Sequence, residues 1–137
     1  MVLFVLLASL WTSSAVGPVA ISMMAVGDGL ADICGRRWGK GNEWSFSPGK
    51  TVAGTAAFIV GSTSFAFAIT KFYAYTNTFV ATPSCLLSGG GGDLELLGRI
   101  AVVSLICAAV ELVSSEKIDD NYSVPIAGVI GGYLLLR

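Results

Sequence analysis

The sequence predicts an all-α protein, a polytopic membrane helical bundle with about four transmembrane helices. The 137 residues are 54% hydrophobic and only 12% charged, whereas soluble domains average about 25% charged residues. The mean hydropathy is +0.76. Apolar segments also alternate with short polar ones, and a membrane helix needs about 20 mostly apolar residues. We expect a single membrane domain over residues 1–137.

The four predicted spans cover residues 2–26, 51–70, 94–113 and 122–136. The first two contain no charged side chain, and the third is long enough but contains charged groups near both ends. The fourth is short, which indicates a tilted or thin span. A cleaved signal peptide over residues 1–17 is disfavoured, because no Lys or Arg precedes Arg36.

This arrangement of spans places two polar loops, residues 27–50 and residues 114–123, on the same side of the membrane. That side carries five of the basic side chains, Arg36, Arg37, Lys40, Lys50 and Lys117. The opposite side carries three, Lys71, Arg99 and Arg137. Because basic residues gather on the cytoplasmic side of membranes, we expect both loops to face the cytosol or stroma.

Composition excludes several classes of function. The net charge of −1 does not favour nucleic acid, which binds basic surfaces. No histidine is present, so imidazole cannot act as a base or a metal ligand. The three cysteines, Cys34, Cys85 and Cys107, lack the paired spacing of zinc sites. Small apolar packing is the simpler interpretation for them.

An acidic pair opens the first polar loop. Asp28 and Asp32 are four residues apart, so they share one face of a helix. The flanking Gly27 and Gly29 would let a ligand approach the backbone closely. Two carboxylates suffice for a magnesium ion carried by a nucleotide. The alternative is a surface ion pair between Asp32 and Arg36; ionisable groups beside a membrane favour the functional interpretation.

Basic and glycine residues follow the acidic pair. Arg36, Arg37 and Lys50 are candidate phosphate ligands, whereas Lys40 is predicted to contact lipid headgroups. For Arg37 and Lys50 the headgroup alternative also stays open, since basic side chains beside a span often extend to the membrane surface. Gly35 and Gly39 indicate either helix packing or a phosphate loop. The segment GKT over residues 49–51 resembles a nucleotide P-loop, but Trp44 occupies the place of its first glycine and no strand is predicted before it.

A second acidic group lies in the loop over residues 114–123. Asp119 and Asp120 could hold a second metal ion or accept the proton of an alcohol. Glu111 lies near the end of the third span and could face the same site. The alternative, a solvated turn before the fourth span, stays open on spacing alone.

The segments GDGLADICGRRWG (residues 27–39) and SPGKTVAG (residues 47–54) resemble the polyprenol kinase family, which includes phytol kinase, farnesol kinase and, more distantly, dolichol kinase. A second block, Glu111 followed by DDNYSVP over residues 119–125, is similar to the other signature of that family. Compared with the dolichol kinase motif, Gly49 replaces a lysine and Ala53 a glutamate; the phytol kinase form fits better. Residues 71–99 carry no resemblance.

The resemblance implies a CTP-dependent kinase that phosphorylates an isoprenoid alcohol, with phytol giving phytyl monophosphate. Magnesium would be held by Asp28, Asp32 and Asp120, and Asp119 or Asp120 would orient the hydroxyl group. The implied nucleotide ligands are Gly35, Arg36, Arg37, Gly39, Lys50, Gly54 and Asn121. The implied location is a chloroplast membrane, if the source is a plant or alga.

Three alternatives to the phytol kinase interpretation stay open. They are farnesol or dolichol kinase activity, a membrane cytidylyltransferase, and a truncated membrane protein without catalysis. Family members usually carry additional N-terminal spans, so we expect this chain to correspond to the C-terminal portion, with N-terminal helices or a partner subunit missing. Membrane lipid, an isoprenoid alcohol and a nucleoside triphosphate are its expected partners.

Overall fold

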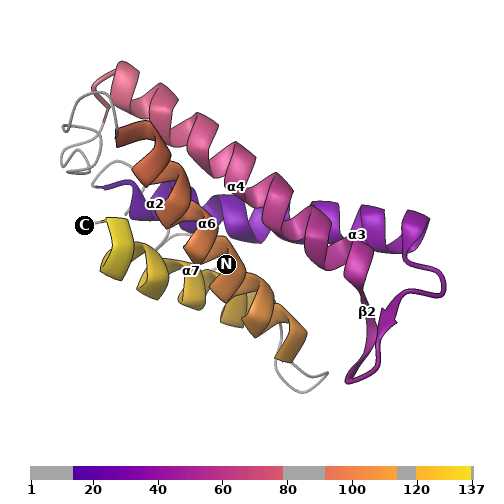
Figure 1. Ribbon diagram of the computed structural model, residues 1–137. Helices are drawn as coiled ribbons and strands as arrows, with labels where there is room; N and C mark the ends of the chain where they lie inside the picture. The colour runs from indigo at the N-terminus through magenta and orange to yellow at the C-terminus, as the bar shows by residue number, and fades with distance from the viewer. Residues whose placement is uncertain (1–13, 79–91, 114–119, 137) are drawn as a thin grey trace.

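The computed structural model describes residues 14–78, 92–113 and 120–136, with side chains in the last range described from Ser123. The chain forms a bundle of helices and one small antiparallel hairpin (Figure 1). The helices are α2 (Val16–Ser22), the π-helical turn η1 (Met23–Gly27), α3 (Asp28–Trp38), α4 (Val52–Tyr75), α6 (Gly92–Val113) and α7 (Asp120–Leu136). The strands are β1 (Glu43–Trp44) and β2 (Ser47–Thr51).

Within the described residues, three stretches are long and apolar enough to cross a membrane, which confirms the predicted membrane helical bundle. The stretches are Val16–Trp38, Val52–Tyr75 and Gly92–Val113, and a shorter apolar helix covers Ser123–Leu136. The second predicted span ended at residue 70, and α4 continues to Tyr75. Length and hydropathy therefore identified the helices well, while their ends were less well predicted.

The loop predicted over residues 27–50 is corrected by the structure. Its first part is helix α3, which continues α2 and η1 without a break, and its last part is the β1–β2 hairpin. Polar residues at the end of a span can extend the helix into water when their spacing supports it. Here Asp32 and Arg36 form an i,i+4 ion pair of the kind that stabilises exposed helix.

The packing of α4 sets the geometry of the bundle. Gly27 of η1 leaves room for the ring of Phe58, since a Cβ atom at this glycine would lie 2.7 Å from that ring. One turn further along the same face of α4, the Ser62 hydroxyl lies 2.7 Å from the Ser104 hydroxyl of α6. Both serines are fully buried, so the hydrogen bond satisfies two polar groups that a membrane interior would leave unsolvated.

Helices α6 and α7 run antiparallel. The Sγ atom of Cys107 lies 3.7 Å from the Val124 carbonyl oxygen, and the Arg99 guanidinium donates to the Leu135 carbonyl oxygen at 2.6 Å. Residue numbers thus rise along α7 as they fall along α6. The start of α7 consequently lies at the same end of the bundle as the end of α6, close to the hairpin end in Figure 1.

The buried core lies where these helices meet. It is formed by buried apolar side chains of α2, η1, α3, α4, α6 and α7, among them Val19, Met23, Phe58, Ile100 and Val103. Many other large apolar side chains on α4 and α6 are exposed, including Val60, Phe72 and Leu105. Exposed apolar faces are expected when lipid takes the place of water around a helix.

Candidate functional site

The β1–β2 hairpin presents Lys50 at the start of α4. Thr51 is the N-cap of that helix, and its hydroxyl accepts a hydrogen bond from the Gly54 backbone N–H at 3.1 Å. The indole Nε1 of Trp44 donates to the Thr55 hydroxyl at 3.1 Å, which fastens β1 to the same turn. Gly49 has φ +84°, a left-handed conformation that favours glycine. These contacts define the position of Lys50.

A short strand does precede α4, contrary to the expectation stated for the GKT segment. Strand β2 covers Ser47–Thr51 and leads directly into the helix. The P-loop interpretation still fails, because Trp44 stands where that motif requires a glycine and β2 belongs to a two-stranded hairpin.

Three glycines bring α3 and the start of α4 into close contact. A Cβ atom at Gly39 would lie 2.5 Å from Thr51 Cγ2, and one at Gly54 would lie 2.8 Å from the Ala31 carbonyl oxygen. A Cβ atom at Gly35 would lie 3.0 Å from the Thr51 hydroxyl. Larger residues would push the helices apart, so these glycines have a packing role whatever else they contact.

The acidic pair lies on the exposed face of α3, directly after the π-helical turn. Asp28 and Asp32 are one helical turn apart, and Arg36 is one turn further on. The Arg36 guanidinium forms an ion pair with Asp32, so the alternative weighed from the sequence does occur. Both side chains are more than half exposed, and such a pair contributes only about 0.5 kcal/mol. A ligand can therefore replace it at small cost.

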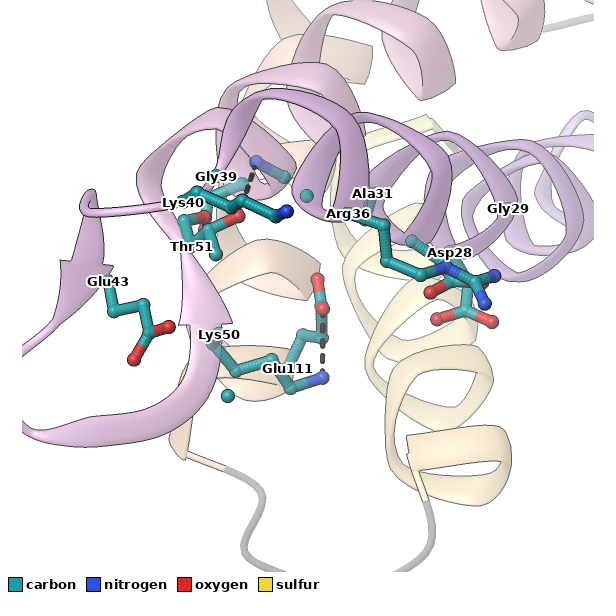
Figure 2. A pocket seen from close by; sticks show the side chains of 15 residues that line it. Asp28, Gly29, Ala31, Arg36, Gly39, Lys40, Glu43, Lys50, Thr51 and Glu111 are labelled. Atoms are coloured by element: carbon teal, nitrogen blue, oxygen red, sulfur yellow. Dashed lines mark hydrogen bonds and ion pairs between the residues drawn. The ribbon is translucent and has the colours of Figure 1, made fainter.

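A second ion pair joins distant parts of the chain. Lys50 Nζ lies 2.9 Å from Glu111 Oε1 on α6. The Glu111 side chain is only 7% exposed and that of Lys50 is 25% exposed. A lysine with flexible methylene groups is thus held in one place, with its charge directed toward the space between α3 and α6 (Figure 2).

These elements enclose a cavity of about 570 Å³ at the hairpin end of the bundle (Figure 2). Side chains or backbone from α3, the hairpin, α4 and α6 form its wall. The lining residues are Asp28, Gly29, Ala31, Asp32, Gly35, Arg36, Gly39, Lys40, Glu43, Gly49, Lys50, Thr51, Gly54, Thr55 and Glu111. Carboxylates, cations and the first turn of a helix thus converge on one space.

Most of the residues predicted as a site meet in this cavity. Those that line it are Asp28, Asp32, Gly35, Arg36, Gly39, Lys50 and Gly54. Arg37 does not line it; its guanidinium carbon lies 5.5 Å from the centre of the Trp38 ring. That position is typical of a cation–π contact.

The remaining predicted residues belong to the second acidic block. Asp119 lies outside the described residues, as do the side chains of Asp120 and Asn121. The backbone of Asp120 begins α7, at the end of the bundle that carries Glu111. The antiparallel register of α6 and α7 is consistent with the two acidic blocks sharing one side of the membrane. The roles assigned to these three residues stay predictions.

Sequence reasoning missed several residues that line the cavity. Lys40 was expected to contact lipid headgroups, and Glu43, Thr51 and Thr55 were assigned no role, yet all four line it. For Glu111 the sequence leaves a position facing the site open, and this residue does line the cavity. An available signal was its position directly after the uncharged, mostly apolar residues 100–110 of α6, because ionisable groups in membrane spans are expensive and often functional.

The carboxylates that line the cavity can be compared with the ligands that the predicted magnesium ion requires. Among the described residues, no group of three or more Cys, Asp or Glu side chains is close enough to hold a metal ion by itself. Magnesium bound to a nucleotide keeps several waters and takes one or two protein carboxylates. Asp28 and Asp32, on one face of α3 and open to the cavity, fit that requirement.

Comparison with known proteins finds relatives over most of the chain. It is 34% identical over 131 residues to "Phytol kinase 1, chloroplastic" of Arabidopsis thaliana, covering 90% of this chain and 38% of that protein. It is 32% identical over 135 residues to "Probable phytol kinase 1, chloroplastic" of Oryza sativa subsp. japonica, covering 98% and 40%. "Farnesol kinase, chloroplastic" of Arabidopsis thaliana is 31% identical over 126 residues, covering 91% and 37%.

The chain spans about two fifths of the length of the curated relatives it matches. No family model matches the chain, and no solved structure matches it.

Proposed function

We propose that this chain, which belongs to the polyprenol kinase family, binds a nucleoside triphosphate in the hairpin-end cavity and phosphorylates an isoprenoid alcohol. The convergence of opposite charges carries the proposal. The acids of α3, the cation of β2 and the acid of α6 line one space of about 570 Å³, although they come from distant parts of the sequence. Phosphoryl transfer depends on such positioned charges more than on covalent chemistry.

The phosphate chain would lie between α3 and the start of α4. Arg36, Lys40 and Lys50 supply positive charge along this path, and charge-assisted hydrogen bonds to phosphate are among the strong ones. Asp28 and Asp32 would hold the magnesium ion of the nucleotide. Bound there, magnesium neutralises charge on the phosphate oxygens. We take CTP as the donor, with ATP and UTP as the competing possibilities.

The acceptor would come from the membrane. Its hydroxyl oxygen would attack the γ-phosphorus, the bond from that phosphorus to the β–γ bridging oxygen would break, and CDP would leave. Asp119 or Asp120 would take the proton of the hydroxyl group, since a carboxylate serves this purpose in other kinases. Phytol is the proposed alcohol, and phytyl monophosphate the product, because most of the relatives are named phytol kinase.

The proposed cellular location of the protein rests on its apolar helices and on the names of its relatives. Three apolar helices of 22 to 24 residues support an integral, multi-pass membrane protein. The relatives are named as chloroplastic, so we assign the chain to a chloroplast membrane. The cavity would then open at the surface where stromal nucleotides are found.

The test is an assay of membranes that contain the full chain. The membranes are given γ-labelled CTP, ATP or UTP with phytol, geranylgeraniol, farnesol or dolichol, and labelled lipid is measured. We expect label to move from CTP to phytol, with CDP as the by-product. Membranes from cells that carry the empty vector are the control.

Other outcomes identify the alternatives. Preference for farnesol or dolichol would replace the proposed acceptor, and release of pyrophosphate with a cytidylyl lipid would indicate a cytidylyltransferase. Nucleotide binding without turnover would contradict the kinase proposal and favour a non-catalytic membrane protein.

A further inference from the structure

The two glycines that flank Asp28 have different surroundings. Sequence alone treats Gly27 and Gly29 alike. At Gly27 a Cβ atom would lie 2.7 Å from the Phe58 ring, so helix packing accounts for this glycine. At Gly29 a Cβ atom would meet nothing within 4 Å among the described residues. Packing against the residues that the structure describes therefore gives no reason for a glycine at position 29.

Backbone conformation gives no reason either. Gly29 lies inside α3, and the described glycines with positive φ are Gly41 and Gly49. Glycine in the interior of a helix destabilises it relative to alanine, because the backbone loses more freedom on folding. An alanine at position 29 would thus fit the space and favour the helix.

The place of Gly29 in the cavity supplies a reason. It lines the cavity together with Asp28 and Asp32, which lie on either side of it in the sequence. Arg36 and Lys50 line the same space, each in an ion pair with a carboxylate that also lines it. A hydrogen at Cα lets an anion with its metal ion approach the helix more closely than a methyl group would.

We infer that Gly29 is the point of closest approach between the α3 backbone and the polyphosphate part of the bound nucleotide. It is a specificity-determining residue for the triphosphate, not a packing residue. The inference rests on the proposed function, because it assigns the contact within the nucleotide site. It also separates Gly29 from Gly35, Gly39 and Gly54, which have packing partners at 3.0 Å or less.

The test compares two glycine-to-alanine variants, one at a residue that lines the cavity and one at a residue that does not. Gly98 is the matched control, because it is an exposed glycine inside α6 that does not line the cavity. A Cβ atom there would also meet nothing within 4 Å in the described part of the chain. Gly29→Ala and Gly98→Ala are made in the full chain. Thermal unfolding and binding of labelled CTP with magnesium are measured in the same detergent, and inorganic triphosphate serves as a competitor.

We expect Gly29→Ala to change thermal stability and nucleotide affinity in opposite directions. Its unfolding temperature should equal or exceed that of the wild type, while affinity for CTP and for inorganic triphosphate should both fall by about tenfold or more, the effect of losing about 1.4 kcal/mol of binding free energy. Gly98→Ala should likewise keep or raise the unfolding temperature, but its affinity for CTP and for triphosphate should not change. A cooperative unfolding transition at or above the wild-type temperature shows that Gly29→Ala has folded.

Three results would overturn the inference. Unchanged CTP affinity in Gly29→Ala, with the wild type binding normally, contradicts the contact while leaving the proposed function intact. Weaker CTP binding with unchanged triphosphate binding places the contact at the base or ribose instead. Failure of the wild type to bind either probe removes the proposed function, and the inference with it.

Discussion

Lys50 Nζ and Glu111 Oε1 lie 2.9 Å apart although 61 positions of sequence separate the two residues. The contact joins the strand before α4 to the last turn of α6, so it links both halves of the cavity wall. Because Glu111 is nearly buried, its carboxylate depends on such a partner for stabilisation.

Removing Glu111 should destabilise the protein more than removing an exposed acid. We expect Glu111→Ala to lower the free energy of unfolding by about 3 kcal/mol, because it leaves Lys50 partly buried without this carboxylate. Asp93→Ala is the control; Asp93 pairs with Lys71 on the surface, where both side chains are over 40% exposed, and should change stability by less than about 1 kcal/mol. Unfolding in mixed detergent micelles measures both.

The charge-exchanged variant Lys50→Glu/Glu111→Lys refines this prediction. It should recover part of the stability lost by Glu111→Ala, since the pair is restored in reverse. Equal stability of Glu111→Ala and Asp93→Ala would show that the buried ion pair stabilises the protein no more than the exposed one.

The acids of α3 should be essential to phosphoryl transfer. We expect Asp28→Ala and Asp32→Ala each to lower the rate by about 100- to 1000-fold, the usual effect of losing one positioned charge in a reacting site. Membrane insertion should not change, because both side chains are exposed. The assay is transfer of label from CTP to phytol.

Glu95 provides a matched control for Asp32. Glu95 and Arg99 form another exposed i,i+4 ion pair, on α6 outside the cavity. Glu95→Ala should retain near-normal activity. Near-normal rates for both aspartate variants would rule out the proposed metal ligands.

Replacing Arg36 and replacing its neighbour Arg37 should affect nucleotide binding differently. Arg36 lines the cavity, whereas Arg37 contacts the Trp38 ring. Arg36→Ala should weaken nucleotide binding by about tenfold or more, the effect of losing one charge-assisted hydrogen bond. Arg37→Ala should leave it within about twofold, a range well below one such bond. An equal loss in both variants, measured by equilibrium binding of labelled CTP, would mean that general positive charge matters and not the position of Arg36.

Removal of divalent cations should stop the reaction reversibly. Chelation with EDTA should abolish transfer from CTP, and added magnesium should restore it, because the phosphate charge needs neutralising. Asp28→Asn should raise the magnesium concentration needed for half-maximal rate if any activity is left. Full activity after chelation would exclude the proposed metal.

The glycines of the α3–α4 contact should affect stability. Gly54→Ala brings a Cβ atom to 2.8 Å from the Ala31 carbonyl oxygen, and backbone cannot move aside without shifting a helix. We expect a loss of about 1–3 kcal/mol. The thermal unfolding of Gly98→Ala again serves as the comparison, and a stable Gly54→Ala would show that the helices can separate freely.

Local patterns in the sequence determined the class of fold and part of the site. Apolar length predicted the helices that α4 and α6 form, because a membrane span leaves its signature within one continuous segment. The spacing of Asp28, Asp32 and Arg36 predicted a shared helical face, since side chains four apart meet on any α-helix.

Only the tertiary structure decided what those residues meet. The pairing of Lys50 with Glu111, the exclusion of Arg37 from the cavity and the different surroundings of Gly27 and Gly29 all depend on how α3, α4 and α6 pack. Such contacts join residues far apart in the chain, and no local periodicity encodes them. The physical reason is that packing selects one arrangement of whole helices, whereas spacing along the chain describes one helix at a time.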